Sequence, residues 1–279
     1  AQYFEDQMPF GEFKKTFPKD YAPPAIMVYY FQELASYRSG GYNLPNFDDI
    51  RRDVGAKNVI RLPLPGETVD PVFKEMWKEV LSELLPADKV EPVLTNRELI
   101  YRVLVLLHEI IGHGSGTYDT AKYAAGQDPI AGLGAMGSAL EEERADLAAL
   151  VFAGDPKLIE VGLYQDAAEA KKIKELMYDF YLSDFLRRVS GQRTLTESHQ
   201  RGHWLLVKKL LDGGGIVWEK TPKQILVVKN YEKCYKISEA LFAELQRIKA
   251  SKDVAALNKL FDKDAPLSAI EDAWAKDVI

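Results

Sequence analysis

The sequence predicts a mainly α-helical protein that carries one small β-hairpin. Two observations lead to this fold class. Apolar residues recur with a period of about 3.6 in segment after segment, which is the pattern of amphipathic helices, whereas runs with the character of strands are few. The chain has 279 residues, of which 47% are hydrophobic, so it is long enough to bury a large core.

The expected helices follow one another along most of the chain. Where the apolar period is sustained we predict helices over 24–38, 71–85, 96–112, 139–153, 166–189, 196–211 and 231–250, with short helices towards the C-terminus. The Gly40-Gly41 pair ends the first of them.

The start and end of some helices have sequence markers. Thr95 with Glu98, and Thr194 with Glu197, each form a capping-box pattern, in which a side chain at the helix start binds a free backbone N–H group. Gly213-Gly214-Gly215 ends the helix over 196–211. These markers predict helix starts near Thr95 and Thr194.

Two apolar runs, 216–218 and 225–228, predict the hairpin, because a turn that carries Thr221-Pro222 separates them. Two long stretches, 43–68 and 114–137, are rich in glycine or proline and are expected to be loops. Loops of such length in a compact domain are usually functional.

No internal repeat, low-complexity tract or linker divides the chain. We therefore expect a single, mostly helical catalytic domain over 1–279, in which 1–42 could be an N-terminal extension.

Charge and composition exclude some classes of function. The net charge is −6, no basic run is present, and an acidic protein is not attracted to nucleic acid or to an anionic membrane. The longest apolar stretches, such as 103–107 and 145–152, are far shorter than the roughly 20 residues of a membrane span. A single cysteine, Cys234, excludes an internal disulfide framework. We expect a soluble cytoplasmic protein, although a disulfide-free periplasmic or secreted protein has the same composition.

The segment HEIIGH, from His108 to His113, has the composition of a catalytic metal site. In the HExxH pattern two histidines four residues apart bind zinc from one helix face, and the glutamate acts as a general base. Here the histidines are five residues apart, so a regular helix would separate them by roughly 140°. A π-bulge would bring both to one ion, and Gly112 makes the distortion easier. The alternative is two unrelated histidines near the end of a buried helix.

A third ligand is sought in the acidic cluster 141–146, because the chain has only four histidines. The cluster begins a helix whose remainder, 147–152, is strongly apolar, and a carboxylate that faces the interior needs a partner or a metal ion. Asp146 lies one turn beyond Glu142 and could hydrogen-bond a ligating histidine. The alternative is an acidic first turn that the helix dipole favours.

The segments HEIIGHGSG and EEERAD together resemble the paired signature of the dipeptidyl peptidase III family, a five-spaced HExxGH followed by EExRA[ED]. In that family the two histidines and the second glutamate of EExRA bind one zinc ion, and the glutamate of the first motif activates water. Carried over to this sequence, the resemblance implies the zinc ligands His108, His113 and Glu142, the base Glu109, and the outer carboxylates Glu141 and Asp146.

Two further segments resemble the same family. NLPN resembles its NxPN segment, which implies that Asn43 and Asn46 bind the substrate near its free N-terminus; the alternative is a loop with local turns. SHQR resembles its histidine segment, which assigns His199 to the oxyanion of the tetrahedral intermediate. His203 stands where the family usually has Arg and is expected to bind substrate; the alternative is a solvated helix face, with His203 against Trp204.

Family members are generally more than twice as long, with an extra lobe that closes over the peptide, so the resemblance implies a compact or truncated relative. The expected function is zinc-dependent hydrolysis of short peptides from the N-terminus, with one zinc ion per chain and peptide as the substrate. Aminopeptidase or endopeptidase action at the same site, a zinc-binding protein that binds peptide without cleaving it, and a helical interaction module without metal are the alternatives. The chain could also associate with itself or with a partner that supplies the second lobe.

Overall fold

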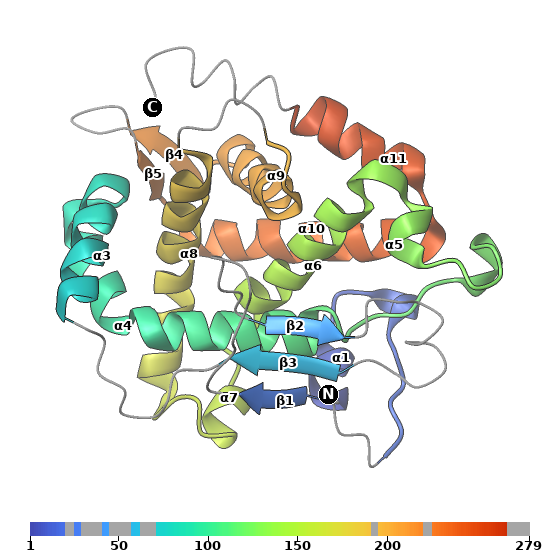
Figure 1. Ribbon diagram of the computed structural model, residues 1–279, viewed down its shortest axis with the longest axis horizontal. Helices are drawn as coiled ribbons and strands as arrows, with labels where there is room; N and C mark the ends of the chain where they lie inside the picture. Colours follow the sequence, from blue (N-terminus) through green and yellow to red (C-terminus); the bar gives the residue numbers. More distant parts are fainter. Residues whose placement is uncertain are drawn as a thin grey trace.

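The computed structural model describes residues 1–19, 25–28, 41–44, 57–61, 71–190, 195–219 and 225–266. Helices make up most of this part of the chain, and the described strands form two small sheets beside them (Figure 1). The mainly α fold class predicted from the sequence is therefore confirmed. None of the helices in the described ranges is long and apolar enough to cross a membrane.

The helix α6 (Gly137–Phe152) lies at the centre of the fold (Figure 1). It packs against α4 (Ala87–Leu106), α8 (Ala167–Val189), α9 (Ser198–Asp212) and α10 (Tyr231–Ser251). Nearly all of its residues are buried, as expected for a helix that has neighbours on several sides. Three of its acidic residues, Glu141, Glu143 and Asp146, are consequently held inside the protein, whereas Glu142 is partly exposed.

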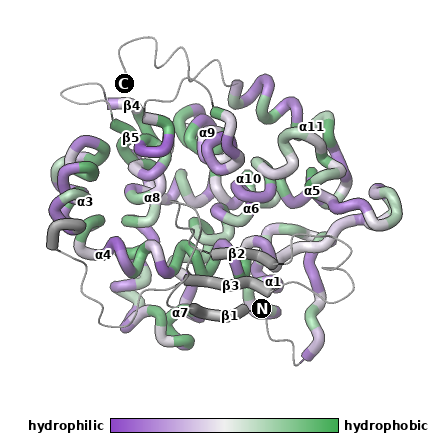
Figure 2. Tube along the Cα trace, viewed as in Figure 1, coloured by the Kyte–Doolittle hydropathy of each residue, from purple (hydrophilic) through white to green (hydrophobic). Residues whose placement is uncertain are grey.

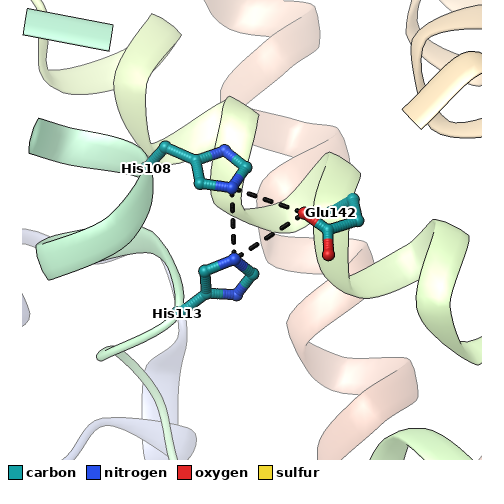
Figure 3. Close-up of side chains that lie close together, drawn as sticks. All are labelled: His108, His113 and Glu142. Atoms are coloured by element: carbon teal, nitrogen blue, oxygen red, sulfur yellow. Dashed lines mark hydrogen bonds and ion pairs between the residues drawn. The ribbon is translucent and has the colours of Figure 1, made fainter. Parts of the chain in front are cut away.

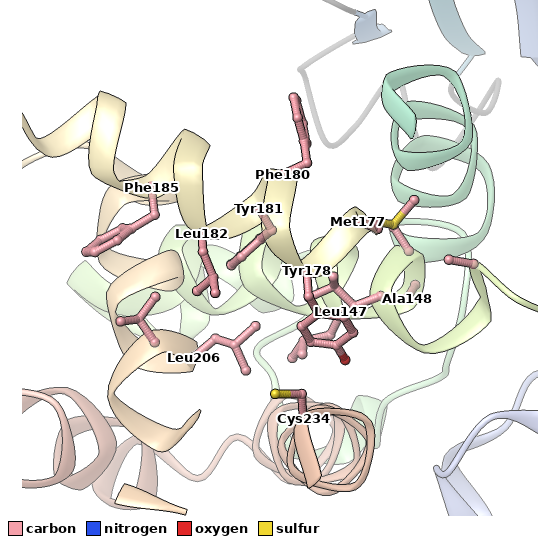
Figure 4. Close-up of a cluster of buried hydrophobic side chains, with 14 of the residues drawn as sticks. Leu147, Ala148, Met177, Tyr178, Phe180, Tyr181, Leu182, Phe185, Leu206 and Cys234 are labelled. Atoms are coloured by element: carbon pink, nitrogen blue, oxygen red, sulfur yellow. The ribbon is translucent and has the colours of Figure 1, made fainter. Parts of the chain in front are cut away.

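The hydrophobic core fills the space between α6, α8, α9 and α10 (Figure 4). By contrast, hydrophilic and hydrophobic residues alternate along α3 (Pro71–Leu84) at one end of the molecule, as in a surface helix with one apolar face (Figure 2). The labelled core side chains are Leu147, Ala148, Met177, Tyr178, Phe180, Tyr181, Leu182, Phe185, Leu206 and Cys234.

Shorter helical segments connect these elements. They are α1 (Gln2–Gln7), η1 (Gly11–Phe13), η2 (Leu107–Gly112), η3 (Thr120–Lys122), α5 (Pro129–Gly132), η4 (Gly134–Met136), α7 (Lys157–Glu160), α11 (Val254–Lys259) and η5 (Leu260–Asp264).

Five predicted helices are confirmed to within a few residues, as α3, α6, α8, α9 and α10. The predicted start of the helix over 96–112 is wrong, because α4 begins at Ala87 and contains Pro92. Thr95 is inside α4, where its hydroxyl donates to Glu91 Oε1 over 3.1 Å instead of capping a helix. Proline usually ends a helix, but in the second turn it removes only one backbone hydrogen bond, and packing against α6 and α8 supports the turn.

The helix α9 starts slightly later than predicted. Its N-cap is Glu197, whose carboxylate accepts hydrogen bonds from the backbone N–H groups of His199 and Gln200. The predicted capping residue, Thr194, lies outside the described residues.

The predicted helix over 24–38 is wrong where the structure describes it, because Ala25–Val28 forms strand β1. Two strands, β2 (Gly41–Leu44) and β3 (Lys57–Arg61), also fall in or next to the predicted loop 43–68. The order is β1-β3-β2, with β1 parallel and β2 antiparallel to β3. A short apolar run does not distinguish strand from helix by its period, and the pairing that decides the matter is remote in sequence.

The predicted hairpin is confirmed as β4 (Ile216–Glu219) and β5 (Ile225–Val228), which pair antiparallel. β5 packs against α8, and β4 packs against α9. The glycine run before the hairpin ends α9, and Gly214 has a φ of +66°, which glycine adopts readily.

Residues 1–19 pack against the loop that follows the HEIIGH segment. The carboxylate of Glu5, which is only 1% exposed, accepts hydrogen bonds from Gly116 N over 3.0 Å and from Lys15 N over 2.6 Å. The Lys15 ammonium donates to the carbonyl of Gly114 over 2.7 Å. The N-terminal segment therefore supports the chain directly behind His113, while the predicted single-domain organisation remains a prediction.

The change Glu5→Ala is expected to lower the free energy of unfolding by about 2 kcal/mol, because one buried and one partly buried N–H donor lose their acceptor. Urea unfolding measures this loss. Glu12→Ala, an exposed change in the same segment, is the control and should stay within about 0.5 kcal/mol of the original protein. Equal stability of the two variants would contradict a role for Glu5 in holding the segment.

Candidate metal centre

The helix α4 continues into η2, a π-helical turn that contains His108 to Gly112 of the HEIIGH segment and has His113 as its C-cap. The backbone N–H of His113 donates to the carbonyl of His108 over 3.0 Å, a hydrogen bond between residues five apart. This wide turn is the distortion predicted from the five-residue spacing, and it turns both imidazole rings towards α6 (Figure 3).

Gly112 allows η2 to pack directly on the backbone of α6. A Cβ atom at this position would lie 2.6 Å from Ala145 Cα and 2.8 Å from Ala145 Cβ, which is closer than atoms can approach. Any larger residue at Gly112 would push the two histidines away from the acidic residues of α6.

The two histidines and Glu142 place three donor atoms around one point (Figure 3). His108 Nε2 lies 3.1 Å from His113 Nε2, and Glu142 Oε2 lies 3.4 Å from His108 Nε2 and 3.7 Å from His113 Nε2. Donor atoms in a tetrahedral zinc site, with bonds of about 2.0–2.2 Å, are separated by roughly 3.3 Å. The three residues therefore fit a single divalent ion such as zinc.

Each of the two histidines also has a carboxylate next to its Nδ1 atom, which orients the ring. Asp146 Oδ1 lies 2.7 Å from His108 Nδ1, and Glu141 Oε1 lies 3.1 Å from His113 Nδ1. Each contact favours a proton on Nδ1, which leaves the Nε2 lone pair of both rings free for a metal ion. Both carboxylates come from α6, one turn or less from Glu142.

Basic residues hold the charge on Glu141. Arg144 donates to both oxygens of this carboxylate over 2.7 Å and 3.0 Å, and Lys249 Nζ from α10 donates over 2.8 Å. Burial alone would raise the pKa of Glu141, but Arg144 and Lys249 hold it well below its usual range. Burial in turn lowers the pKa of Lys249 to about 8, and the charge of Arg144 adds to this shift.

His199 approaches the site from α9. Its Nε2 lies 3.2 Å from Glu142 Oε2, and its Nδ1 lies 2.7 Å from Glu197 Oε1. Burial opposes a charge on this ring, but Glu142 and Glu197 raise the pKa of His199 to about 10. The nearby imidazole rings of His108 and His199 hold the pKa of Glu142 well below its usual range despite burial.

Glu109 lies in the same π-turn, between the two histidines in sequence, and is half-buried. A cavity of about 330 Å³ opens beside His113 and Glu142. Its lining consists of Lys15, His113, Gly116, Thr117, Tyr118, Asp128, Pro129, Ile130, Ser138, Glu141, Glu142 and Lys249.

The structure describes the remaining predicted site residues to different extents. Asn43 lies in β2, opposite Asn58 of β3, and β3 contacts η2. Asn46 is outside the described residues. His203 is only 4% exposed and bonds to Asp146, a position that differs from the substrate contact expected for it.

A second group of acidic residues and histidine lies behind the first and comprises Glu143, Asp146 and His203. His203 Nε2 is 2.7 Å from Asp146 Oδ2, which is a hydrogen-bond distance and shorter than the spacing of donor atoms on one metal ion. Tyr181 donates to Glu143 Oε2 over 2.8 Å, and burial, together with Asp146, raises the pKa of Glu143 well above its usual range. This group is a buried hydrogen-bonded network.

Sequence reasoning missed the basic residues around Glu141. Arg144 stands in the same acidic segment, and an arginine next to paired acids at the start of an apolar helix is a signal that could have been used. In the structure its side chain is fully buried and pairs with Glu141. Lys15 and Lys249 reach the site from both ends of the chain, so no local pattern indicates them.

Comparisons with known proteins agree with these findings. The model of peptidase family M49 matches residues 7–122 and 119–279. The chain is 23% identical over 269 residues to dipeptidyl peptidase 3 of Dictyostelium discoideum. This match covers 80% of this chain and 37% of that protein. Its structure is similar to that of DPP III from Caldithrix abyssi, with a TM-score of 0.69, 21% identity and 99% of this chain covered.

DPP III from Corallococcus sp. strain EGB is also similar, with a TM-score of 0.60, 22% identity and 86% of this chain covered. The chain covers 51% of the Caldithrix structure and 41% of the Corallococcus structure, so it spans about half, or less, of the length of these relatives.

Proposed function

The chain belongs to peptidase family M49, and on that basis we propose that it hydrolyses short peptides with one zinc ion and releases dipeptides from the N-terminus. The observation that carries the proposal is the set of three donor atoms 3.1–3.7 Å apart, with Glu109 in the turn that bears two of them. The names of the relatives support dipeptide release. Since the chain spans only part of their length, their activity comes to this chain as a proposal.

His108, His113 and Glu142 would hold the ion. When bound, zinc supplies a Lewis acid that lowers the pKa of water towards about 7 and polarises a carbonyl group. Glu109 takes a proton from the attacking water and later gives it to the leaving amine, so one carboxylate serves as base and then as acid.

His199 is proposed to stabilise the negative charge that develops on the carbonyl oxygen. Its side chain is 34% exposed, so it reaches solvent beside the ligands, and Glu197 fixes one ring nitrogen while the other faces Glu142. Loss of one such donor typically reduces turnover roughly 100-fold to 1000-fold.

The substrate is proposed to lie between β2 and the ligands. β2 is at one edge of the three-stranded sheet in the described part of the chain, and an extended peptide can bind such an edge through its backbone. Asn43 and Asn46 would hold the peptide in register. The cavity of about 330 Å³ is near the lower limit for ligand pockets, which favours short peptides over folded proteins.

Incubation with a panel of tetra- to octapeptides, followed by mass measurement of the products, tests the proposal. We expect dipeptides as the first products, no cleavage of N-acetylated versions, and one zinc ion per chain by elemental analysis. A chelator should abolish cleavage, and added zinc should restore it.

Other outcomes distinguish the alternatives. Single amino acids as first products would replace dipeptide release by aminopeptidase action, and internal fragments from acetylated peptides would indicate an endopeptidase. A zinc-loaded protein that binds these peptides and yields no product would contradict hydrolysis.

A further inference from the structure

Two pairs, each of a histidine with a carboxylate, join α9 to α6. His199 Nε2 lies 3.2 Å from Glu142 Oε2, and His203 Nε2 lies 2.7 Å from Asp146 Oδ2. Within each helix the two residues are four positions apart, so the pairs lie one turn apart along both helices. We call His199 with Glu142 the outer pair and His203 with Asp146 the inner pair.

The inner pair is buried and continues to a metal ligand. His203 is 4% exposed and Asp146 is 5% exposed. Asp146 uses Oδ2 for His203 and Oδ1 for His108 Nδ1, and both distances are 2.7 Å. An ionised carboxylate only accepts hydrogen bonds, so both imidazoles donate an N–H group to it. The two contacts together fix the plane of the Asp146 carboxylate.

Close packing leaves His203 little freedom. The neighbouring Gly202 allows α9 to approach α6, because a Cβ atom there would lie 2.9 Å from Glu143 Cβ and 3.0 Å from Ala139 O. The ring of Tyr181 lies 4.3 Å from the ring of His203, centre to centre. His203 is only 4% exposed, so very little of its surface is accessible to a peptide.

We infer that His203 is a positioning residue that acts on the metal through Asp146 and His108. Its Nε2–H group holds Asp146, Asp146 holds the Nδ1–H group of His108, and the Nε2 atom of His108 is thereby directed at the metal position. The same contact sets the position of α9 along α6, which keeps His199 facing Glu142. This inference rests on the proposed zinc function and assigns His203 a role other than substrate binding.

The affinity for zinc, measured by competition with a coloured chelator, tests the inference. His203→Phe keeps a ring against Tyr181 but removes the donor to Asp146, and we expect the dissociation constant for zinc to rise about tenfold, the lower end of the range for outer partners of ligands. His203→Gln places an amide N–H group near the position of Nε2 and should restore most of the affinity. The visible spectrum of the cobalt-substituted protein should change in His203→Phe and return in His203→Gln.

Tyr181→Phe is the matched control. It removes a hydroxyl group from the same buried network, but from Glu143 rather than Asp146. We expect it to lower the melting temperature and leave the affinity for zinc near that of the original protein. With saturating zinc, His203→Phe should keep a normal KM for peptide.

Three results would overturn the inference. The first is a zinc affinity and a KM that are both unchanged in His203→Phe. The second is a loss of zinc affinity in Tyr181→Phe equal to that in His203→Phe. The third is an unchanged zinc affinity with a raised KM in His203→Phe, which would indicate that His203 contacts the substrate. In each case the original protein still binds zinc and cleaves peptide, so the proposed function stands. If the original protein binds no zinc, both the proposed function and the inference about His203 are wrong.

Discussion

Replacing Glu109 with Gln is expected to abolish peptide hydrolysis while the protein keeps its zinc ion. Glu109 lies in the π-turn between the two histidines and is outside the group of donor atoms that fit the metal. The amide has nearly the size of the carboxylate but cannot take a proton from water. A general base increases the reaction rate by about 100-fold to 10,000-fold, so kcat should fall by at least about 100-fold.

The measurement is kcat with a tetrapeptide, together with zinc content by elemental analysis. Glu98→Gln is a matched control on α4, where the carboxylate is 41% exposed and pairs with Arg102. We expect this control to keep both activity and zinc. Near-normal turnover of Glu109→Gln would remove the assigned base, whereas a protein without zinc would give Glu109 a part in metal binding.

Replacing Glu142 with Gln is expected to weaken zinc binding by more than about 100-fold. Glu142 Oε2 lies 3.4 Å and 3.7 Å from the two histidine nitrogens, and it brings the only negative charge among the three proposed ligands. Removing a residue that only hydrogen-bonds a metal ligand weakens metal binding by about 10-fold to 100-fold. The loss of a ligand itself should therefore have a larger effect.

Glu143→Gln, the next residue on the same helix, gives a sharp control. Burial, followed by the charge of Asp146, raises the pKa of Glu143 well above its usual range, which favours the uncharged acid, and a neutral amide has nearly the same size. Chelator competition with both variants should separate them by at least tenfold in zinc affinity. Equal affinities would exclude Glu142 as a ligand.

The sequence predicts the local geometry of the candidate metal centre better than the surrounding fold, because that geometry depends on local spacing. Five residues between His108 and His113 require a wide turn, and the structure has a π-turn at that position. Acidic residues at the start of an otherwise apolar helix require buried partners, and α6 supplies them to both histidines. In both cases geometry within one helix limits the solutions.

The errors have a common physical origin in contacts between remote segments. The strand Ala25–Val28 is specified by pairing with Lys57–Arg61, which no local pattern reveals. Lys249 stands 108 residues from Glu141 in the sequence, yet it neutralises the same carboxylate that orients His113. His203 has the spacing of a surface pair with His199, but the absence of a side chain at Gly202 lets α9 come close enough to bury it.

The π-turn has a consequence for how this site is compared with ordinary HExxH helices. A π-turn is equivalent to one extra residue inserted into an α-helix, and here the insertion lies between Glu109 and His113, where Gly112 touches Ala145. In three dimensions the two histidines reach the same point that a four-residue spacing would give them. Two histidines can therefore be close in space without the usual spacing along the chain. A sequence search that requires four-residue spacing would miss the proposed ligand set.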